Sequence, residues 1–198
     1  MIKLHWSKEN PKIGNIPNIS LEPVASCPNN EWCFQKELDL KCYAMKSFVQ
    51  YPATRIAWRE NFQLAQNDLN SFESQLVNKL SRTCKKFFRI HVAGDFFNQE
   101  YLDMWKDTAR QFKHINFLAF TKSFHLDYSH KPRNLKIVWS VMPNMPTLPK
   151  ACKGSRAYCG PIEQRRKKER IMICPGHCES CGMCWNLKGS ESAHFDIH

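Results

Sequence analysis

A strand is predicted at Phe87-Phe88-Arg89-Ile90-His91-Val92-Ala93, a run of β-branched and aromatic residues that ends at Gly94-Asp95. Asn98 can cap the helix that is predicted to follow, because the next residues place apolar side chains on one helical face. Two further strands are predicted at 115–120 and 136–142. A pattern of strand, crossover segment and next strand, repeated at these lengths, indicates parallel strands joined by right-handed connections.

The rest of the chain is organised around this core. Apolar residues recur every three or four positions from Thr54 to Leu80, which predicts one long helix or two consecutive helices with a buried face. The 198 residues are expected to form a single domain, with a cysteine-rich segment at 1–52, an α/β core at 53–145 and a basic, cysteine-rich segment at 146–198. The expected fold class is α/β: a small, partial (βα) barrel-like parallel sheet whose irregular cysteine-rich ends close over a metal site.

Four of the ten cysteines lie close together near the C-terminal end, at gaps of three, two and two residues, in the stretch Cys174-Pro175-Gly176-His177-Cys178-Glu179-Ser180-Cys181-Gly182-Met183-Cys184. Short gaps let successive thiolates turn toward one centre. A structural zinc site usually brings two cysteine pairs separated by a longer spacer, so this continuous run favours iron–sulfur ligation. The first three cysteines also reproduce the spacing of the radical S-adenosylmethionine signature.

A second group of cysteines lies near the other end of the chain. We expect the two ends to meet at one 4Fe-4S cluster, with zinc as the alternative, and the candidate metal ligands are Cys27, Cys33, Cys42, Cys174, Cys178, Cys181 and Cys184. Cys84 precedes a predicted strand and is interpreted as a small core residue. Whether Cys152 and Cys159 bind metal is left open.

Disulfide pairing is the alternative for an even number of cysteines. The first residues, Met1 to Trp6, lack the apolar stretch of a signal peptide, so we expect a reducing cytoplasmic environment and free thiols. No run approaches the roughly 18 apolar residues of a membrane span, so a soluble protein with no membrane partner is expected.

The charge predicts a polyanionic partner. Lys and Arg total 29 against 18 Asp and Glu, which gives a formal net charge of +11. Much of the excess lies in one stretch, and the candidate nucleic-acid-binding residues are Lys150, Lys153, Arg156, Arg165, Arg166, Lys167, Lys168 and Arg170. The alternative is that this run is only a solvated face. Its position directly before the C-terminal cysteines favours nucleic acid, with RNA preferred over DNA.

Polar residues follow each predicted strand, where ligands of parallel sheets bind. The candidate catalytic residues are Asp95, Lys122, Ser123 and His91. Each also has an ordinary interpretation: Asp95 as a helix cap, Lys122 as an exposed lysine and His91 as a hydrogen-bonded core residue. Their occurrence at successive strand ends is what indicates a shared site.

Five motifs in register give the chain a resemblance to a known family. They are Asn18-Ile19-Ser20-Leu21 with Cys27-Pro28, Lys41-Cys42-Tyr43-Ala44, His91-Val92-Ala93-Gly94-Asp95-Phe96-Phe97, Ala119-Phe120-Thr121-Lys122-Ser123 and Cys181-Gly182-Met183-Cys184-Trp185. Together they resemble the small phage-encoded proteins named after mycobacteriophage gene product 88. The resemblance implies a phage or prophage origin, a location in the host cytoplasm, and a shortened relative of the radical S-adenosylmethionine barrels with iron and sulfur held at both ends. Radical enzymes place a three-cysteine loop after the first strand, whereas the C-terminal run follows the last predicted strand, which argues against S-adenosylmethionine binding.

Three functions are compatible with these features. The first is an iron–sulfur enzyme acting on nucleic acid, most simply a nuclease that cleaves RNA, in which Asp95, Lys122 and Ser123 assist the reaction. The second is a radical S-adenosylmethionine-like enzyme. The third is a binding module with a structural metal, which docks on nucleic acid or on a host protein as a regulator or counter-defence factor.

Overall fold

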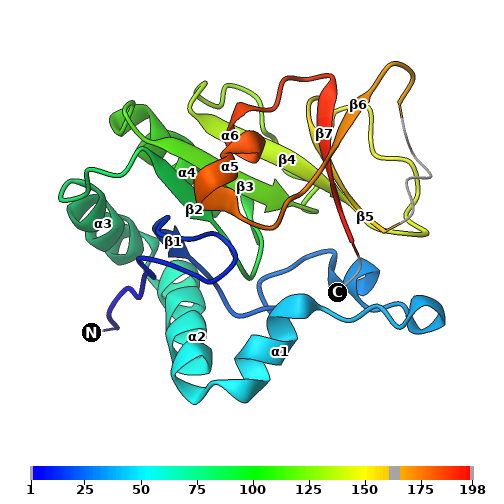
Figure 1. Cartoon of the computed structure of the whole chain (residues 1–198). Coiled ribbons are helices and arrows are strands. Elements are labelled where there is room, and N and C mark those ends of the chain that lie inside the picture. Colours follow the sequence, from blue (N-terminus) through cyan, green and yellow to red (C-terminus); the bar gives the residue numbers. More distant parts are fainter. Residues whose placement is uncertain (1, 161–165, 197–198) are drawn as a thin grey trace.

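The computed structural model describes residues 2–160 and 166–196. A seven-stranded sheet forms its centre, in the order β1-β2-β3-β4-β5-β7-β6 (Figure 1). Every neighbouring pair is parallel. The strands are β1 (Asn18–Ile19), β2 (Phe87–Ile90), β3 (Asn116–Thr121), β4 (Leu135–Val141), β5 (Arg156–Cys159), β6 (Arg170–Ile173) and β7 (Glu191–Phe195). The predicted α/β class with a parallel sheet is therefore confirmed.

The three predicted strands correspond to β2, β3 and β4. They were recognisable because parallel strands covered on both faces are nearly continuous apolar runs. The other four strands were not predicted. They have only two to five residues, too few to establish a hydrophobic period.

The helices are α1 (Tyr43–Gln50), α2 (Pro52–Asn67), α3 (Leu69–Leu80), α4 (Gln99–Gln111), α5 (Cys178–Cys181) and α6 (Met183–Asn186), with short 3-10 turns η1 (Asn30–Cys33) and η2 (Lys36–Leu38). The stretch from Thr54 to Leu80 forms two helices, because Asp68 ends α2 and caps α3 by accepting a hydrogen bond from the Ser71 amide at 2.9 Å. Asn98 caps α4 in the same way, as predicted. None of the helices in the described part of the chain is long and apolar enough to cross a bilayer.

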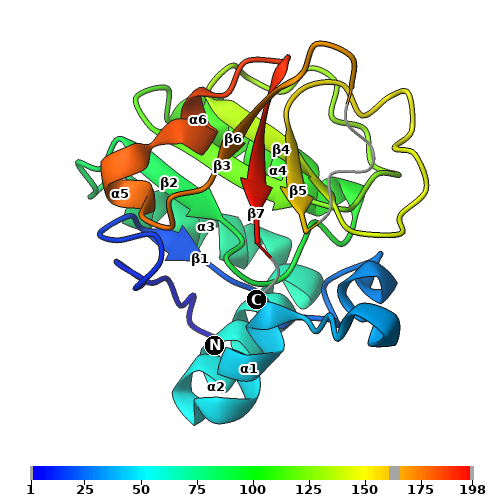
Figure 2. The ribbon, with the colours of Figure 1, turned by 45° about the vertical axis from the view of Figure 1, so that its right-hand side comes forward.

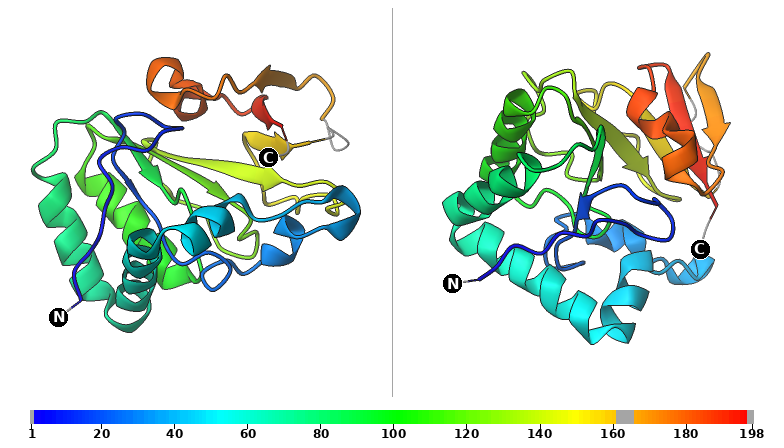
Figure 3. Two further views of the ribbon diagram at one scale, coloured as in Figure 1. Left: turned by 60° about the horizontal axis from the view of Figure 1, so that its bottom comes forward. Right: turned by 60° about the vertical axis from the view of Figure 1, so that its left-hand side comes forward.

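The two faces of the sheet are covered by different parts of the chain. Helices α2, α3 and α4 lie on one side, and the C-terminal segment with α5 and α6 lies on the other (Figures 2 and 3). Side chains alternate accordingly: Phe88 and Ile90 of β2 pack with the helices, whereas Leu118 of β3 packs with Trp185 of α6. The C-terminal segment thus places its cysteines over the face of the sheet opposite the three helices.

Candidate functional site

The N-terminal segment lies across the carboxyl ends of the strands. It carries Cys27, Cys33 and Cys42, here called the N-terminal cysteine group, and begins directly after β1. Three hydrogen bonds tie the segment to the loops that follow β2, β3 and β4: Tyr43 Oη donates to the Val92 carbonyl, Asn29 to the Lys122 carbonyl, and Gln35 Nε2 to the Pro143 carbonyl at 2.7 Å. The N-terminal segment is therefore attached to the carboxyl ends of three strands of the sheet.

A close approach of two backbones makes this arrangement specific. Leu21 N donates to the Ala93 carbonyl at 2.9 Å, which continues the pairing of β1 with β2 beyond both strands. Gly94 has a φ of +90°, and a Cβ there would lie 2.6 Å from Ser26 Oγ, the residue before Cys27. Only glycine adopts this conformation and leaves this space without strain.

The thiols of the N-terminal group affect one another. The Cys33 thiol donates a hydrogen bond to Cys42, which lowers the pKa of Cys42 to about 6 and raises the pKa of Cys33. Burial raises the pKa of Cys27 to about 11, and the nearby Asp95 carboxylate adds to this shift. The three thiols therefore lie near one another, and Cys42 is the one most readily ionised.

Lys122 and Asp95 lie beside these thiols. Burial would lower the pKa of the Lys122 ammonium, but the negative charges of Cys33 and Asp95 outweigh this and raise it. Asp95 is buried and its carboxylate accepts hydrogen bonds from Thr121 Oγ1 at 2.6 Å, from the Lys122 amide at 2.8 Å and from the Phe96 amide at 2.8 Å. Burial nevertheless raises the pKa of Asp95. The carboxylate fastens the loop after β2 to the end of β3.

Ser123 and His91 occupy different surroundings from the other two candidate catalytic residues. Ser123 is fully buried, and its hydroxyl donates to the Phe96 carbonyl at 2.6 Å. The His91 ring is buried on the helical side of the sheet, with Nε2 3.0 Å from the Tyr101 hydroxyl. Burial lowers the pKa of His91 to about 3, so this ring is neutral at physiological pH. The structure brings Asp95 and Lys122 to the thiols, and it places Ser123 and His91 in the core.

The C-terminal cysteine group consists of Cys174, Cys178, Cys181 and Cys184, which line one small pocket together. Burial raises the pKa of Cys184 to about 12, and the charges of the other three cysteines also act on it. Two contacts dock the group on the sheet: Trp185 Nε1 donates to the Phe88 carbonyl at 3.3 Å, and the Trp185 ring packs 5.2 Å from the ring of Phe87.

The two groups lie on different segments, one beyond the strand ends and one over the face of the sheet. The ribbon of residues 27–42 and the ribbon of α5 and α6 are apart in every view (Figures 1 to 3). Arg89 of β2 lies near the C-terminal group and near Tyr43: its guanidinium stacks 4.0 Å from the ring centroid of Phe120, and the charges of Tyr43, Cys184 and Cys178 act on it. No three His, Cys, Asp or Glu side chains of residues 2–160 and 166–196 converge as ligands of one metal ion.

The remaining cysteines differ from one another in their surroundings. Cys159 ends β5, so it lies at the same strand-end rim, where Lys122 and Cys33 act on its charge. Sequence reasoning left its role open because β5 was not predicted. Cys152 is buried. Cys84 is exposed in the loop between α3 and β2, so its interpretation as a core residue was wrong.

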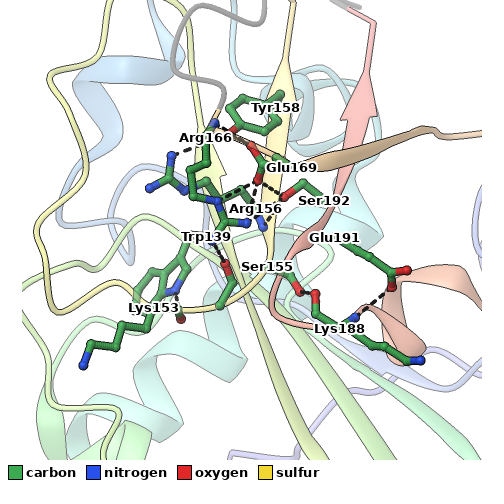
Figure 4. A network of polar contacts seen from close by, with 11 residues as sticks. Trp139, Lys153, Ser155, Arg156, Tyr158, Arg166, Glu169, Lys188, Glu191 and Ser192 are labelled. Carbon is green, nitrogen blue, oxygen red and sulfur yellow. Dashed lines mark hydrogen bonds and ion pairs between the residues drawn. The ribbon is translucent and has the colours of Figure 1, made fainter.

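The basic stretch divides into internal and exposed residues. The Arg166 guanidinium forms an ion pair with the buried Glu169 carboxylate at 2.6 Å and also donates to the Gly154 carbonyl (Figure 4). Arg156 is half-buried in the same network, and Arg170 is exposed, 3.7 Å from Glu191. Four lysines are also exposed: Lys150, Lys153, Lys167 and Lys168. The remaining candidate, Arg165, lies outside the described residues.

Buried Glu169 holds the strands at this edge together. Tyr158 of β5 donates to its carboxylate at 2.7 Å, and Ser192 of β7 donates at 2.5 Å (Figure 4). Burial alone would raise the pKa of Glu169, but these hydrogen bonds and those from Arg166 lower it overall. Arg166 and Glu169 therefore have a structural role that the charge pattern did not indicate.

These features define an α/β protein with one cysteine group at the strand ends and another on the sheet face. Residues 3–168 match the family described as Gene product 88, and the chain belongs to that family. It is 25% identical to the Gene 88 protein of Mycobacterium phage D29 over 186 aligned residues, which cover 78% of this chain and 76% of that protein. No solved structure gives a significant match. The family resemblance inferred from the motifs is thus confirmed.

Proposed function

We propose that this protein is an iron–sulfur enzyme of the radical S-adenosylmethionine type, with its reaction site at the carboxyl ends of the parallel strands. One observation supports this most directly: the segment after the first strand carries the N-terminal cysteine group, which lies beside Lys122 and Asp95. The C-terminal run, which argued against S-adenosylmethionine, is not the group at this position.

The donor set at the strand ends fits an iron–sulfur cluster. Thiolates are the usual protein ligands of such clusters, and the pKa of about 6 at Cys42 favours its thiolate form near neutral pH. A 4Fe-4S cluster binds each thiolate to a different iron, so the cysteines need to be grouped without converging on one point. Three thiols would bind three irons of a 4Fe-4S cluster, and when bound the cluster would supply one-electron chemistry and an open iron for S-adenosylmethionine.

The neighbouring residues would position and compensate this site. The Lys122 ammonium lies close enough to Cys33 and Asp95 for their charges to act on it, so it would offset the negative charge of the thiolates. Asp95 would act as a positioning residue, because its carboxylate holds the Lys122 amide and the Thr121 hydroxyl. Replacing Asp95 by Asn would leave the shape but weaken both hydrogen bonds.

The RNA nuclease is the second candidate, and the exposed charge supports it. Lys150, Lys153, Lys167 and Lys168 are free to meet phosphates in solution. Ser123 is less suited to the role of nucleophile, since its hydroxyl is buried and bonded to the Phe96 carbonyl. A binding module that uses the same lysines would bind RNA without cleaving it.

The test uses anaerobically reconstituted full-length protein with dithionite as the one-electron reductant. The proposal expects S-adenosylmethionine to be cleaved to methionine and 5′-deoxyadenosine, each event consuming one electron and one hydrogen atom. Cys42→Ala should abolish this product. RNA cleavage without S-adenosylmethionine would instead establish the nuclease.

Cys159 provides the control for whether the strand-end cluster keeps one iron without a protein ligand. It lies near Cys33 but is not one of the three proposed ligands, so Cys159→Ala should keep both the iron content and the 5′-deoxyadenosine product. If Cys159→Ala loses iron to the same extent as Cys42→Ala, four thiols close the site and S-adenosylmethionine has no position there.

A further inference from the structure

The C-terminal cysteine group has enough thiols to supply every protein ligand of an iron–sulfur cluster. Its four thiols line the same pocket, and three of them act on the charge of Cys184. Four thiolates are the usual ligand number of a closed 4Fe-4S or 2Fe-2S cluster. The N-terminal group is therefore not needed to complete a site here.

The docking of this group keeps it away from the strand ends. Trp185 attaches it to the start of β2, through Phe87 and the Phe88 carbonyl. On the other side, the Cys178 amide donates to the Lys12 carbonyl, and Glu179 accepts from the Asn15 amide at 2.9 Å. At a rise of roughly 3.3 Å per residue, Phe88 lies about 7 Å before the end of β2 at Ile90, beyond which the N-terminal group begins.

Arg89 is a positive charge without a carboxylate partner. Among the described residues it forms no ion pair with Asp or Glu. Its guanidinium contacts the His91 carbonyl at 3.2 Å and the Phe120 ring. Arg89 is half-buried, and a guanidinium partly removed from water is stabilised by an anion nearby. The groups closest to it that can become anionic are Cys178, Cys184 and Tyr43. Negative charge held by the C-terminal thiolates would satisfy this requirement.

We propose that the C-terminal cysteine group binds an iron–sulfur cluster of its own, separate from the strand-end site, and that Arg89 is the positive charge that compensates it. This second centre is closed by four thiolates, so it would store or pass an electron and would bind no substrate at iron. The inference does not require that the strand-end site uses S-adenosylmethionine.

The presence of two separate clusters can be tested by measuring the iron bound per chain in three forms of the full-length protein. With about four irons per 4Fe-4S centre, the wild-type chain should hold about eight, and each of two variants should hold about four. One variant replaces Cys27, Cys33 and Cys42 by Ala, and the other replaces all four C-terminal cysteines. A single shared cluster would give about four irons in the wild type and almost none in either variant, which would overturn the proposal.

Two further results separate this inference from the proposed function. If the N-terminal variant holds the same four irons as the wild type, the strand-end cluster is absent and the second centre stands. If the N-terminal variant holds zinc and no sulfide, the C-terminal group is a zinc site and the inference fails.

A single substitution avoids the risk that the fourfold variant does not fold. Cys181 is exposed, so Cys181→Ser removes a ligand without removing buried apolar area. It should change one of two electron paramagnetic resonance signals and leave the other intact. A change in both signals, or in neither, would contradict two separate centres.

The role of Arg89 can be tested by comparing a variant that keeps its positive charge with one that removes it. Arg89→Lys should keep the reduction potential of the C-terminal centre close to that of the wild type, whereas Arg89→Met should make it more negative, because the reduced, more anionic form loses its counter-charge. The N-terminal variant should be the background, so that only one centre is titrated. Equal potentials in Arg89→Lys and Arg89→Met would remove Arg89 from the proposal.

Discussion

Replacing Gly94 by Ala tests how the N-terminal cysteine segment is held over the strand ends. A Cβ at this position would lie 2.6 Å from Ser26 Oγ and 2.8 Å from Leu21 Cβ, inside normal contact distance. The φ of +90° is also one that residues with a side chain rarely adopt. The substitution therefore has a backbone cost and a steric cost.

The two costs can be separated with Gly154, which has a φ of +108° and no atom within 4 Å of its built Cβ. Gly154→Ala has only the backbone cost, on the order of 1–3 kcal/mol. Gly94→Ala adds the cost of forcing apart two packed segments, again about 1–3 kcal/mol. We expect Gly94→Ala to lower the free energy of unfolding by roughly 2–6 kcal/mol in total.

Guanidinium denaturation of the metal-free, reduced protein measures both variants. Gly94→Ala should lose about 1–3 kcal/mol more than Gly154→Ala, with similar dependence on denaturant concentration. After reconstitution, Gly94→Ala should also lose iron from the N-terminal group, since Ser26 directly precedes Cys27. Equal losses of stability in the two variants would show that the contact with Ser26 and Leu21 has no effect, and the reasoning would fail.

Three further predictions follow from side chains described above. Glu169→Gln should cost about 1–3 kcal/mol at pH 7. The pKa of Glu169 is lowered from 4.5 in the folded protein, so the stabilisation from its carboxylate is present above pH 4.5 and is lost as the pH falls through the lower, folded-state pKa. The melting temperature of Glu169→Gln should therefore fall less steeply with acid than that of the wild type. Parallel plots of melting temperature against pH would contradict this. Trp185→Ala should destabilise by about 3–5 kcal/mol in urea, and a loss below 1 kcal/mol would mean that the C-terminal layer is not packed on β2. Cys84→Ala should change stability by less than about 0.5 kcal/mol, and a thiol reagent should modify Cys84 before the buried Cys152; the reverse order would contradict the exposed position.

The sequence predicted those parts of the fold whose pattern is local and long enough. Strand β2 and helix α4 are examples, since an apolar run and the cap at Asn98 mark them directly. Strand β7 was missed because its five residues include Glu191, Ser192 and His194, and they are ordered by partners elsewhere in the chain. Ser192, for instance, is bonded to the Glu169 carboxylate.

The candidate site was predictable to a similar degree. The rule that parallel strands end at one edge predicted that Asp95 and Lys122 meet, and they do. Spacing could not show that the Ser123 hydroxyl bonds to the Phe96 carbonyl. Nor could it place the N-terminal cysteines, because β1 has two residues and pairs with a strand 71 positions later.

The position of β7 between β5 and β6 has a consequence for the order in which the chain is completed. A ribosome makes β6 first, then the four C-terminal cysteines, and only afterwards the strand through which β6 joins the sheet. Until β7 has emerged, β6 has no neighbour to pair with, and the cysteines between them lie on an untethered loop. The strand-end cysteines, made some 130 residues earlier, have their supporting strands by then. The C-terminal cysteines are therefore the later of the two groups to gain a fixed position during synthesis.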